Sequence, residues 1–151
     1  MDDLQVRRAA REDMRAALEI VGHMFGDLGT PDNTEGWRDG ALEAFAERAA
    51  SAAIFVVSEQ GQVVGVAAGV VDQRLPSPRR PLGRIGYVEW LGTLPSHRRR
   101  GVARLTLRAL LNWFMDQDIA VIHVHASAQA QALYLDLGFT APHATALRWR
   151  G

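Results

Sequence analysis

The stretch VEWLGTLPSHRRRGVARLTLRALL, residues 88–111, joins three different local patterns. It begins as a strand-like run that Pro95 ends, because proline cannot donate a hydrogen bond to a β-ladder. It then continues as a long run in which apolar residues recur at helical spacing from Val102 to Trp113. The segment SHRRRGVA between them, residues 96–103, is therefore predicted to be a folded turn that leads directly into a helix.

This turn has the chemistry of an anion site. Gly101 lets the backbone approach a ligand closely, and the first N–H groups of a helix have no intrahelical acceptor. Arg98, Arg99 and Arg100 add guanidinium donors, and a pyrophosphate needs several donors aimed at one point. A short basic cluster is otherwise often a solvated surface. Its place between a strand and an apolar helix favours the anion site.

The remaining patterns predict alternating strands and helices. The predicted elements are a strand at residues 4–9, helices at 11–25 and about 34–49, a hairpin at 53–71, a loop at 72–83, a strand at 85–94, the helix from 102, a strand at 119–126, a helix at 128–137 and a strand at 144–149. A strand-helix-strand unit crosses over right-handedly, so its two strands are parallel. Together these elements predict an α/β or α+β fold, a mixed sheet of six or seven strands with helices on both faces.

Composition narrows the class of protein. A chain of 151 residues with 48% hydrophobic content is long enough for one core, so residues 1–151 are predicted to form a single domain. Seventeen basic residues balance seventeen acidic ones, which disfavours binding to nucleic acid or to an anionic membrane. The absence of cysteine excludes disulfides and thiol nucleophiles. The charged N-terminus and strand-sized apolar runs predict a cytoplasmic protein.

Two short motifs follow one another about thirty residues apart, with one predicted strand between them. Arg98-x-x-Gly101-x-Ala103 opens the long helix, and ALYLDLGF, residues 132–139, lies near the C-terminus. They resemble the Arg/Gln-x-x-Gly-x-Gly/Ala and Ala-Leu-Tyr-x-x-x-Gly-Phe signatures of the GCN5-related N-acetyltransferases. The order of elements fits that family along the whole chain, although residues 1–84 fit it only in pattern.

The resemblance implies transfer of an acetyl group from acetyl-CoA to a primary amine of a small molecule or peptide. The amine would attack directly in a ternary complex, without a metal and without a covalent enzyme intermediate. The sheet would be mostly antiparallel, with the fourth and fifth strands parallel and splayed around the pantetheine arm. A homodimer stays open, and so does a rival class of protein, a non-catalytic module that binds acyl-CoA as a sensor.

The same resemblance assigns contacts to acetyl-CoA. Leu91, Gly92 and Thr93 would lie along the pantetheine arm, with the Leu91 N–H facing the thioester carbonyl and Gly92 beside a β-bulge. The residues implied at the pyrophosphate are Arg98, Arg99, Arg100, Gly101, Val102, Ala103 and Arg104. Two positions depart from the family, since Ser127 stands where asparagine is common and Arg99 stands where glycine is common.

Tyr134 and Glu89 are the predicted catalytic residues. Tyr134 would contact the cofactor and protonate the coenzyme A thiolate, although an aromatic on an amphipathic helix is usually core. Glu89 would accept the amine proton, and an ion pair with an arginine is its alternative. His123 and His125 share one strand face and are alternative bases. A His-x-His pair without a third ligand is a weak zinc motif, so no metal is predicted.

The acceptor amine is left open by the sequence. It is expected to bind where the first two helices, the proline-rich loop and the final strands meet. Met24, Phe25, Trp37 and Arg84 are candidates for lining that pocket, and ordinary packing explains each of them equally well.

Overall fold

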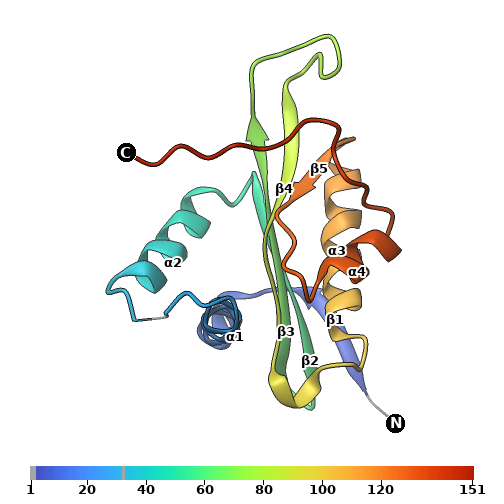
Figure 1. Ribbon diagram of the computed structural model, residues 1–151. Helices are drawn as coiled ribbons and strands as arrows, with labels where there is room; N and C mark the ends of the chain where they lie inside the picture. The colour runs from blue at the N-terminus through green and yellow to red at the C-terminus, as the bar shows by residue number, and fades with distance from the viewer. Residues whose placement is uncertain (1–2, 32) are drawn as a thin grey trace.

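One five-stranded sheet forms the centre of the computed structural model, which describes residues 3–31 and 33–151 (Figure 1). The strands are β1 (Leu4–Arg8), β2 (Ala52–Glu59), β3 (Gln62–Gln73), β4 (Arg84–Thr93) and β5 (Ile122–Val124). They follow one another across the sheet in chain order, antiparallel except for the parallel pair β4 and β5. The mixed, mostly antiparallel sheet is therefore as predicted, but it has five strands and not six or seven.

The strand predicted at residues 144–149 is wrong. Residues 139–151 contain neither helix nor strand, and this tail runs extended across the molecule (Figure 1). Leu147 and Trp149, which the alternating pattern would bury, are 92% and 88% exposed. The neighbouring edge strand, β5, has only three residues and therefore offers few backbone groups with which another strand could pair.

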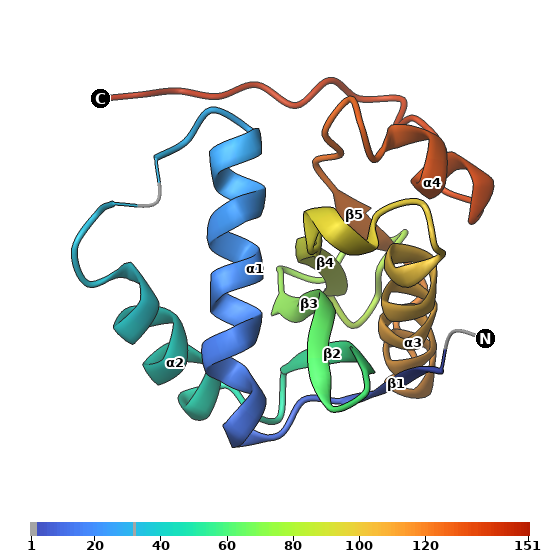
Figure 2. The ribbon, with the colours of Figure 1, turned by 90° about the horizontal axis from the view of Figure 1, so that it is seen from below.

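Helices cover both faces of the sheet, as predicted. The turns and helices are η1 (Arg11–Asp13), α1 (Met14–Asp27), α2 (Trp37–Glu47), η2 (Pro95–His97), α3 (Val102–Asp116) and α4 (Gln131–Asp136). Figure 2 shows α1 and α2 on one side of the strands and α3 and α4 on the other. None of the helices in the described residues has the length and apolar content needed to cross a membrane.

Each face of the sheet has its own core. On one face, Ile20 and Val21 of α1 pack with Ile54 and Val66 of the sheet. On the other face, residues of α3 pack with Ala53, Ala67 and Val88, and the α3 side chains involved include Leu107, Leu110 and Phe114. Burial of apolar area of this kind contributes roughly 25 cal/mol per Å². These two cores fix the position of β4, because its side chains alternate between them.

Candidate active site

Strands β4 and β5 separate halfway along β4. Strand β5 pairs only with Gly86, Tyr87 and Val88, whereas β4 continues to Thr93 along β3. The backbone of residues 91–93 therefore has a strand on one side only, which confirms the splayed parallel pair. An edge of this kind leaves N–H and C=O groups free to bind an extended ligand.

The β-bulge of β4 lies at Glu89 and not beside Gly92. The register passes from Ala68 opposite Trp90 to Gly69 opposite Val88, so Glu89 is the extra residue. Gly92 pairs regularly, and its lack of a side chain has another cause: a Cβ there would lie 2.9 Å from Cγ2 of Ile20 in α1. Consecutive residues of a regular strand point to opposite faces of the sheet. The bulge breaks this alternation, so Glu89 and Trp90 line the same cavity.

Two adjoining cavities of about 210 Å³ and 730 Å³ form one groove beyond the point where the strands separate. We call this groove the β4–β5 cleft. The two cavities share Thr93, Arg98, Ala103, Gln129 and Leu133. The cleft brings together most of the predicted cofactor residues, namely Leu91, Gly92, Thr93, Arg98, Arg99, Gly101, Val102, Ala103, Arg104 and Ser127.

The turn before α3 has the backbone of an anion site. Gly101 has φ +81° and Arg99 has φ +62°, so two residues of the turn are left-handed. The first helical hydrogen bond runs from the Leu105 N–H to the Gly101 carbonyl, which leaves the N–H groups of residues 102–104 without helical acceptors. The positive end of the α3 dipole adds to them. Arg99 adopts a conformation that favours glycine, so its backbone is strained in this turn.

Three of the arginines in this region pair with carboxylates of other elements. Arg98 donates to Asp27 at 2.5 Å, and Arg104 donates to Asp136 at 2.5 Å. The side chain of Arg100 donates to Glu59 at 2.5 Å and does not line the cleft. Only its backbone N–H remains as a predicted contact. Arg99 makes no ion pair within residues 3–31 and 33–151, although it lines the cleft.

Glu59, which the sequence did not indicate, links the end of β2 to this turn. Its Oε2 lies 2.6 Å from Nε2 of His97, and its Oε1 accepts from Arg100. The hydrogen bond from Arg100, and then the one with His97, lower the pKa of Glu59 from 4.5 to about 2. The carboxylate therefore stays charged at neutral pH and clamps the turn from both ends.

Tyr134 is buried in α4. Its ring packs edge-to-face with Phe139 at 5.2 Å between centroids, and burial raises the pKa of its hydroxyl to about 12. The hydroxyl has no hydrogen-bond partner in the part of the chain that the structure describes. Tyr134 is not among the residues that line the cleft, but its neighbour Leu133 is.

Glu89 faces the α2 side of the sheet. Tyr87 and two histidines of the β5 region are the polar residues nearest to it along the sheet. The ion pair considered as the alternative role of Glu89 is not made with any described residue. Tyr87 lies two residues away and is hydrogen-bonded to Nδ1 of His125, and burial, followed by the charge of Glu89, raises the pKa of Tyr87. His123 stands opposite Tyr87, and its pKa is lowered by burial and then by nearby arginines. No three acidic or histidine side chains of the described residues meet as a metal site.

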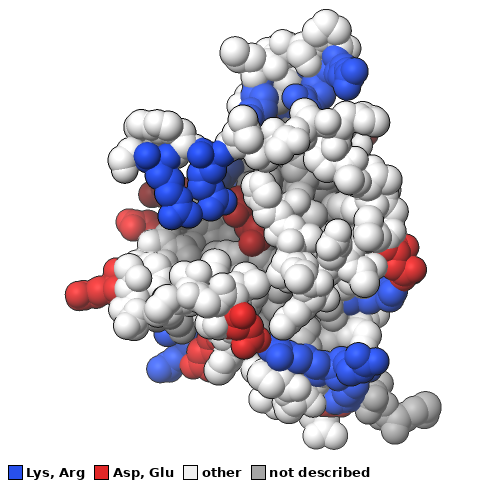
Figure 3. Space-filling model, in the orientation of Figure 1, with Lys and Arg blue, Asp and Glu red and all other residues white. Residues whose placement is uncertain are grey.

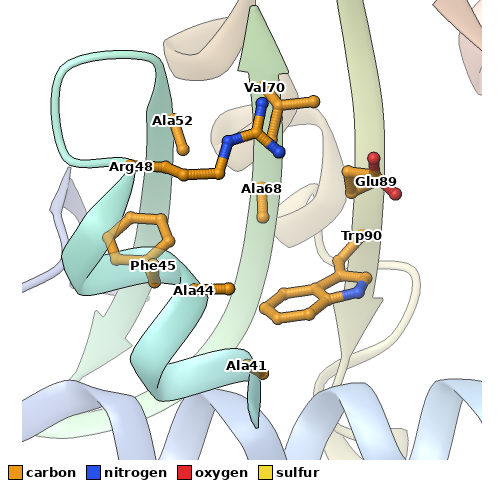
Figure 4. A pocket seen from close by; sticks show the side chains of 10 residues that line it. Ala41, Ala44, Phe45, Arg48, Ala52, Ala68, Val70, Glu89 and Trp90 are labelled. Carbon is orange, nitrogen blue, oxygen red and sulfur yellow. The ribbon is translucent and has the colours of Figure 1, made fainter. Parts of the chain in front are cut away.

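A separate cavity of about 170 Å³ lies between α2 and the sheet, and we call it the α2 cavity. Figure 3 shows basic and acidic side chains meeting at the hollow between α2 and the C-terminal tail. Arg48, Glu89, Phe45 and Trp90 line this cavity (Figure 4). Sequence reasoning singled out only Glu89 of these four.

The earlier candidates for the acceptor pocket lie elsewhere. Phe25 and Trp37 pack against each other with ring centroids 6.0 Å apart. Arg84 donates to the carbonyl of Gln117 at 3.1 Å, and Met24 lines the β4–β5 cleft. None of these four lines the α2 cavity.

Comparison with known proteins places the chain in a family. Residues 22–139 match the model of the acetyltransferase (GNAT) family. The chain therefore belongs to this family, whose enzymes use acetyl-CoA as cosubstrate. No curated protein is similar enough in sequence to count as a match.

Solved structures with the same fold cover nearly the whole chain. A predicted acetyltransferase with acetyl-CoA from Clostridium acetobutylicum is 22% identical, with a TM-score of 0.85 and 96% of each chain covered. A GCN5-related N-acetyltransferase from Ralstonia eutropha JMP134 is 25% identical, with a TM-score of 0.84 and coverage of 98% of this chain and 99% of that one. AAC(6')-Iy, in complex with the bisubstrate analogue CoA-S-monomethyl-acetylneamine, is 18% identical, with a TM-score of 0.78 and coverage of 98% and 99%.

Proposed function

We propose that residues 1–151 form one catalytic domain that acetylates a primary amine of a small molecule or peptide. The amine attacks acetyl-CoA directly in a ternary complex. The observation that carries this proposal is the β4–β5 cleft, because it joins a free strand edge to a left-handed turn at the N-terminus of α3. A free strand edge suits the amide groups of a pantetheine arm, and helix N–H groups suit a pyrophosphate.

Each part of the cleft has its own task. The N–H groups of Val102, Ala103 and Arg104 bind the pyrophosphate, with Arg99 adding a guanidinium. Leu91 donates its N–H to the thioester carbonyl oxygen, where negative charge develops. Ser127 lines the cleft at the position where the family commonly has asparagine, and its hydroxyl offers a shorter contact.

Two side chains move protons. Glu89, directly or through a water, accepts a proton from the substrate ammonium, so that a neutral amine attacks the acetyl carbon. The bond between that carbon and sulfur breaks, and Tyr134 donates its hydroxyl proton to the leaving thiolate. The second proton of the attacking nitrogen returns through water to the Tyr134 oxygen, so the products are a neutral amide and a free thiol. Burial raises the pKa of Tyr134 to about 12, so the hydroxyl is protonated at neutral pH and has a proton to give.

Release of free thiol from acetyl-CoA, measured against a panel of primary amines, tests this function. Turnover with at least one amine is expected, and binding of acetyl-CoA without turnover would favour the sensor module. The Glu89→Gln variant should lower kcat about 100-fold or more, the usual contribution of a general base, without changing the affinity for acetyl-CoA. Glu12→Gln removes an exposed carboxylate from η1, outside both the cleft and the α2 cavity, and should leave kcat unchanged.

Loss of the Glu59 clamp is expected to weaken binding rather than chemistry. Glu59→Gln should raise the KM for acetyl-CoA about 3- to 10-fold, the effect of losing one or two hydrogen bonds that order the turn. The kcat should be nearly unchanged, because Glu59 does not take part in the reaction. In the wild type the clamp is complete above pH 4.5 and is lost as the pH falls toward 2, since folding lowers the pKa of Glu59.

A matched control is Asp13→Asn, which breaks the ion pair between η1 and Arg7 of β1 and does not touch the turn before α3. This variant should lose stability and keep the wild-type KM. An equal rise in KM for both variants would mean that Glu59 acts only on general stability.

A further inference from the structure

Two opposite charges stand at the mouth of the α2 cavity, on the exposed residues Arg48 and Glu89. Arg48 caps the C-terminus of α2, and Glu89 is the bulged residue of β4. Neither side chain makes an ion pair or a hydrogen bond with another residue in ranges 3–31 and 33–151. Arg98 and Arg104, by contrast, each reach a carboxylate. A free carboxylate and a free guanidinium in one cavity fit a ligand that carries both charges.

The walls of the cavity are apolar. Phe45 and Trp90 supply two aromatic rings, and the rest of the lining is small, made by Ala41, Ala44, Ala52, Ala68, Gly69 and Val70. Figure 4 shows the rings of Phe45 and Trp90 on different sides of the cavity, with the Arg48 side chain extending above them toward β3. Such walls bind the hydrocarbon part of a ligand.

The size and charge of the cavity restrict the acceptor further. Its volume of about 170 Å³ lies below the roughly 300–1,000 Å³ of sites for drug-sized ligands. A polyamino sugar would bring several positive charges to a lining that already contains Arg48 and has one carboxylate. The cavity therefore suits a small ligand with one ammonium, one carboxylate and an apolar body.

We infer that the acceptor is a small amine that also carries a carboxylate and an apolar side chain, as an apolar α-amino acid does. Its ammonium lies at Glu89, its carboxylate at Arg48, and its side chain against Phe45 and Trp90. This inference rests on the proposed function and names its substrate class. In the reaction a bond forms between the amino nitrogen and the acetyl carbon, and the bond from that carbon to sulfur breaks. The ammonium loses one proton to Glu89 before it attacks. A second proton leaves the nitrogen as the amide forms and replaces the one that Tyr134 gives to the sulfur, so coenzyme A leaves as the free thiol.

Three acceptors that differ in a single group test the inference at saturating acetyl-CoA. They are leucine, leucinamide, in which an amide replaces the carboxylate, and isoamylamine, in which the carboxylate is missing. We expect kcat/KM for leucine to exceed that for either of the others at least about 10-fold, since a charged hydrogen bond is lost in both. In Arg48→Met this preference should collapse to about 1, and in Arg15→Met, an exposed arginine of α1, it should persist.

Each failure has a distinct meaning. If leucinamide or isoamylamine has the same kcat/KM as leucine, the acceptor class is wrong and acetyl transfer stands. If none of the three is acetylated although calorimetry detects bound acetyl-CoA, the amine panel separates the two failures. Turnover of another amine means that the acceptor class is wrong, and no turnover of any amine means that the proposed function fails. If the protein does not bind acetyl-CoA, the proposed function itself fails.

Discussion

Replacement of Gly101 by valine should raise the Kd for acetyl-CoA about 10- to 100-fold, the equivalent of the roughly 1.5–3 kcal/mol of a charged hydrogen bond. Gly101 has φ +81°, a conformation that a β-branched residue adopts only under strain. No atom lies within 4 Å of the Cβ position, so the effect comes from the backbone and not from a clash. The turn should relax toward negative φ, and its N–H groups would no longer converge on the pyrophosphate.

Gly36→Val is the matched control for this change. Gly36 is also the residue before a helix, α2, with φ +86° and with open space at its Cβ position. Both variants should lose about 1–3 kcal/mol of stability from strain. Only Gly101→Val should weaken acetyl-CoA binding in a calorimetric titration. Unchanged affinity in that variant would remove the turn from the site.

The Tyr134→Phe variant should lower kcat by about 100- to 10,000-fold, the range expected for a general acid. The hydroxyl makes no hydrogen bond to any described residue, so its loss should change neither Tm nor the affinity for acetyl-CoA. Because burial raises its pKa to about 12, the wild-type rate should show no loss from Tyr134 ionisation below about pH 11. Full turnover in Tyr134→Phe would exclude it from the mechanism.

The segment from β4 through α3 could be predicted because its signals are local. Pro95 ends the strand, Gly101 permits the turn, and the apolar spacing after Val102 defines the helix. Arg98, Arg99 and residues 101–104 line the cleft because the left-handed turn, which a short local motif specifies, places them there. The Arg100 side chain was the exception, since its carboxylate partner comes from β2.

Features that depend on distant segments could not be predicted in the same way. The bulge at Glu89 results from the pairing of β4 with β3, and no residue near Glu89 indicates it. Glu59 is 38 residues from His97 and 41 from Arg100 along the chain. The alternation at residues 144–149 is typical of a strand, but alternation alone does not supply a neighbouring strand with which to pair.

A comparison of acetyl-CoA with S-acetylpantetheine, which lacks the nucleotide and its diphosphate, measures what the turn before α3 contributes to binding. If the backbone N–H groups before and within the first turn of α3 hold the diphosphate, calorimetry should give one acetyl-CoA site per chain. Its Kd should lie between about 1 µM and 1 mM, and S-acetylpantetheine should bind at least about 100-fold more weakly. Equal affinity for the two thioesters, or no heat from acetyl-CoA at millimolar concentration, would show that this turn does not bind the diphosphate.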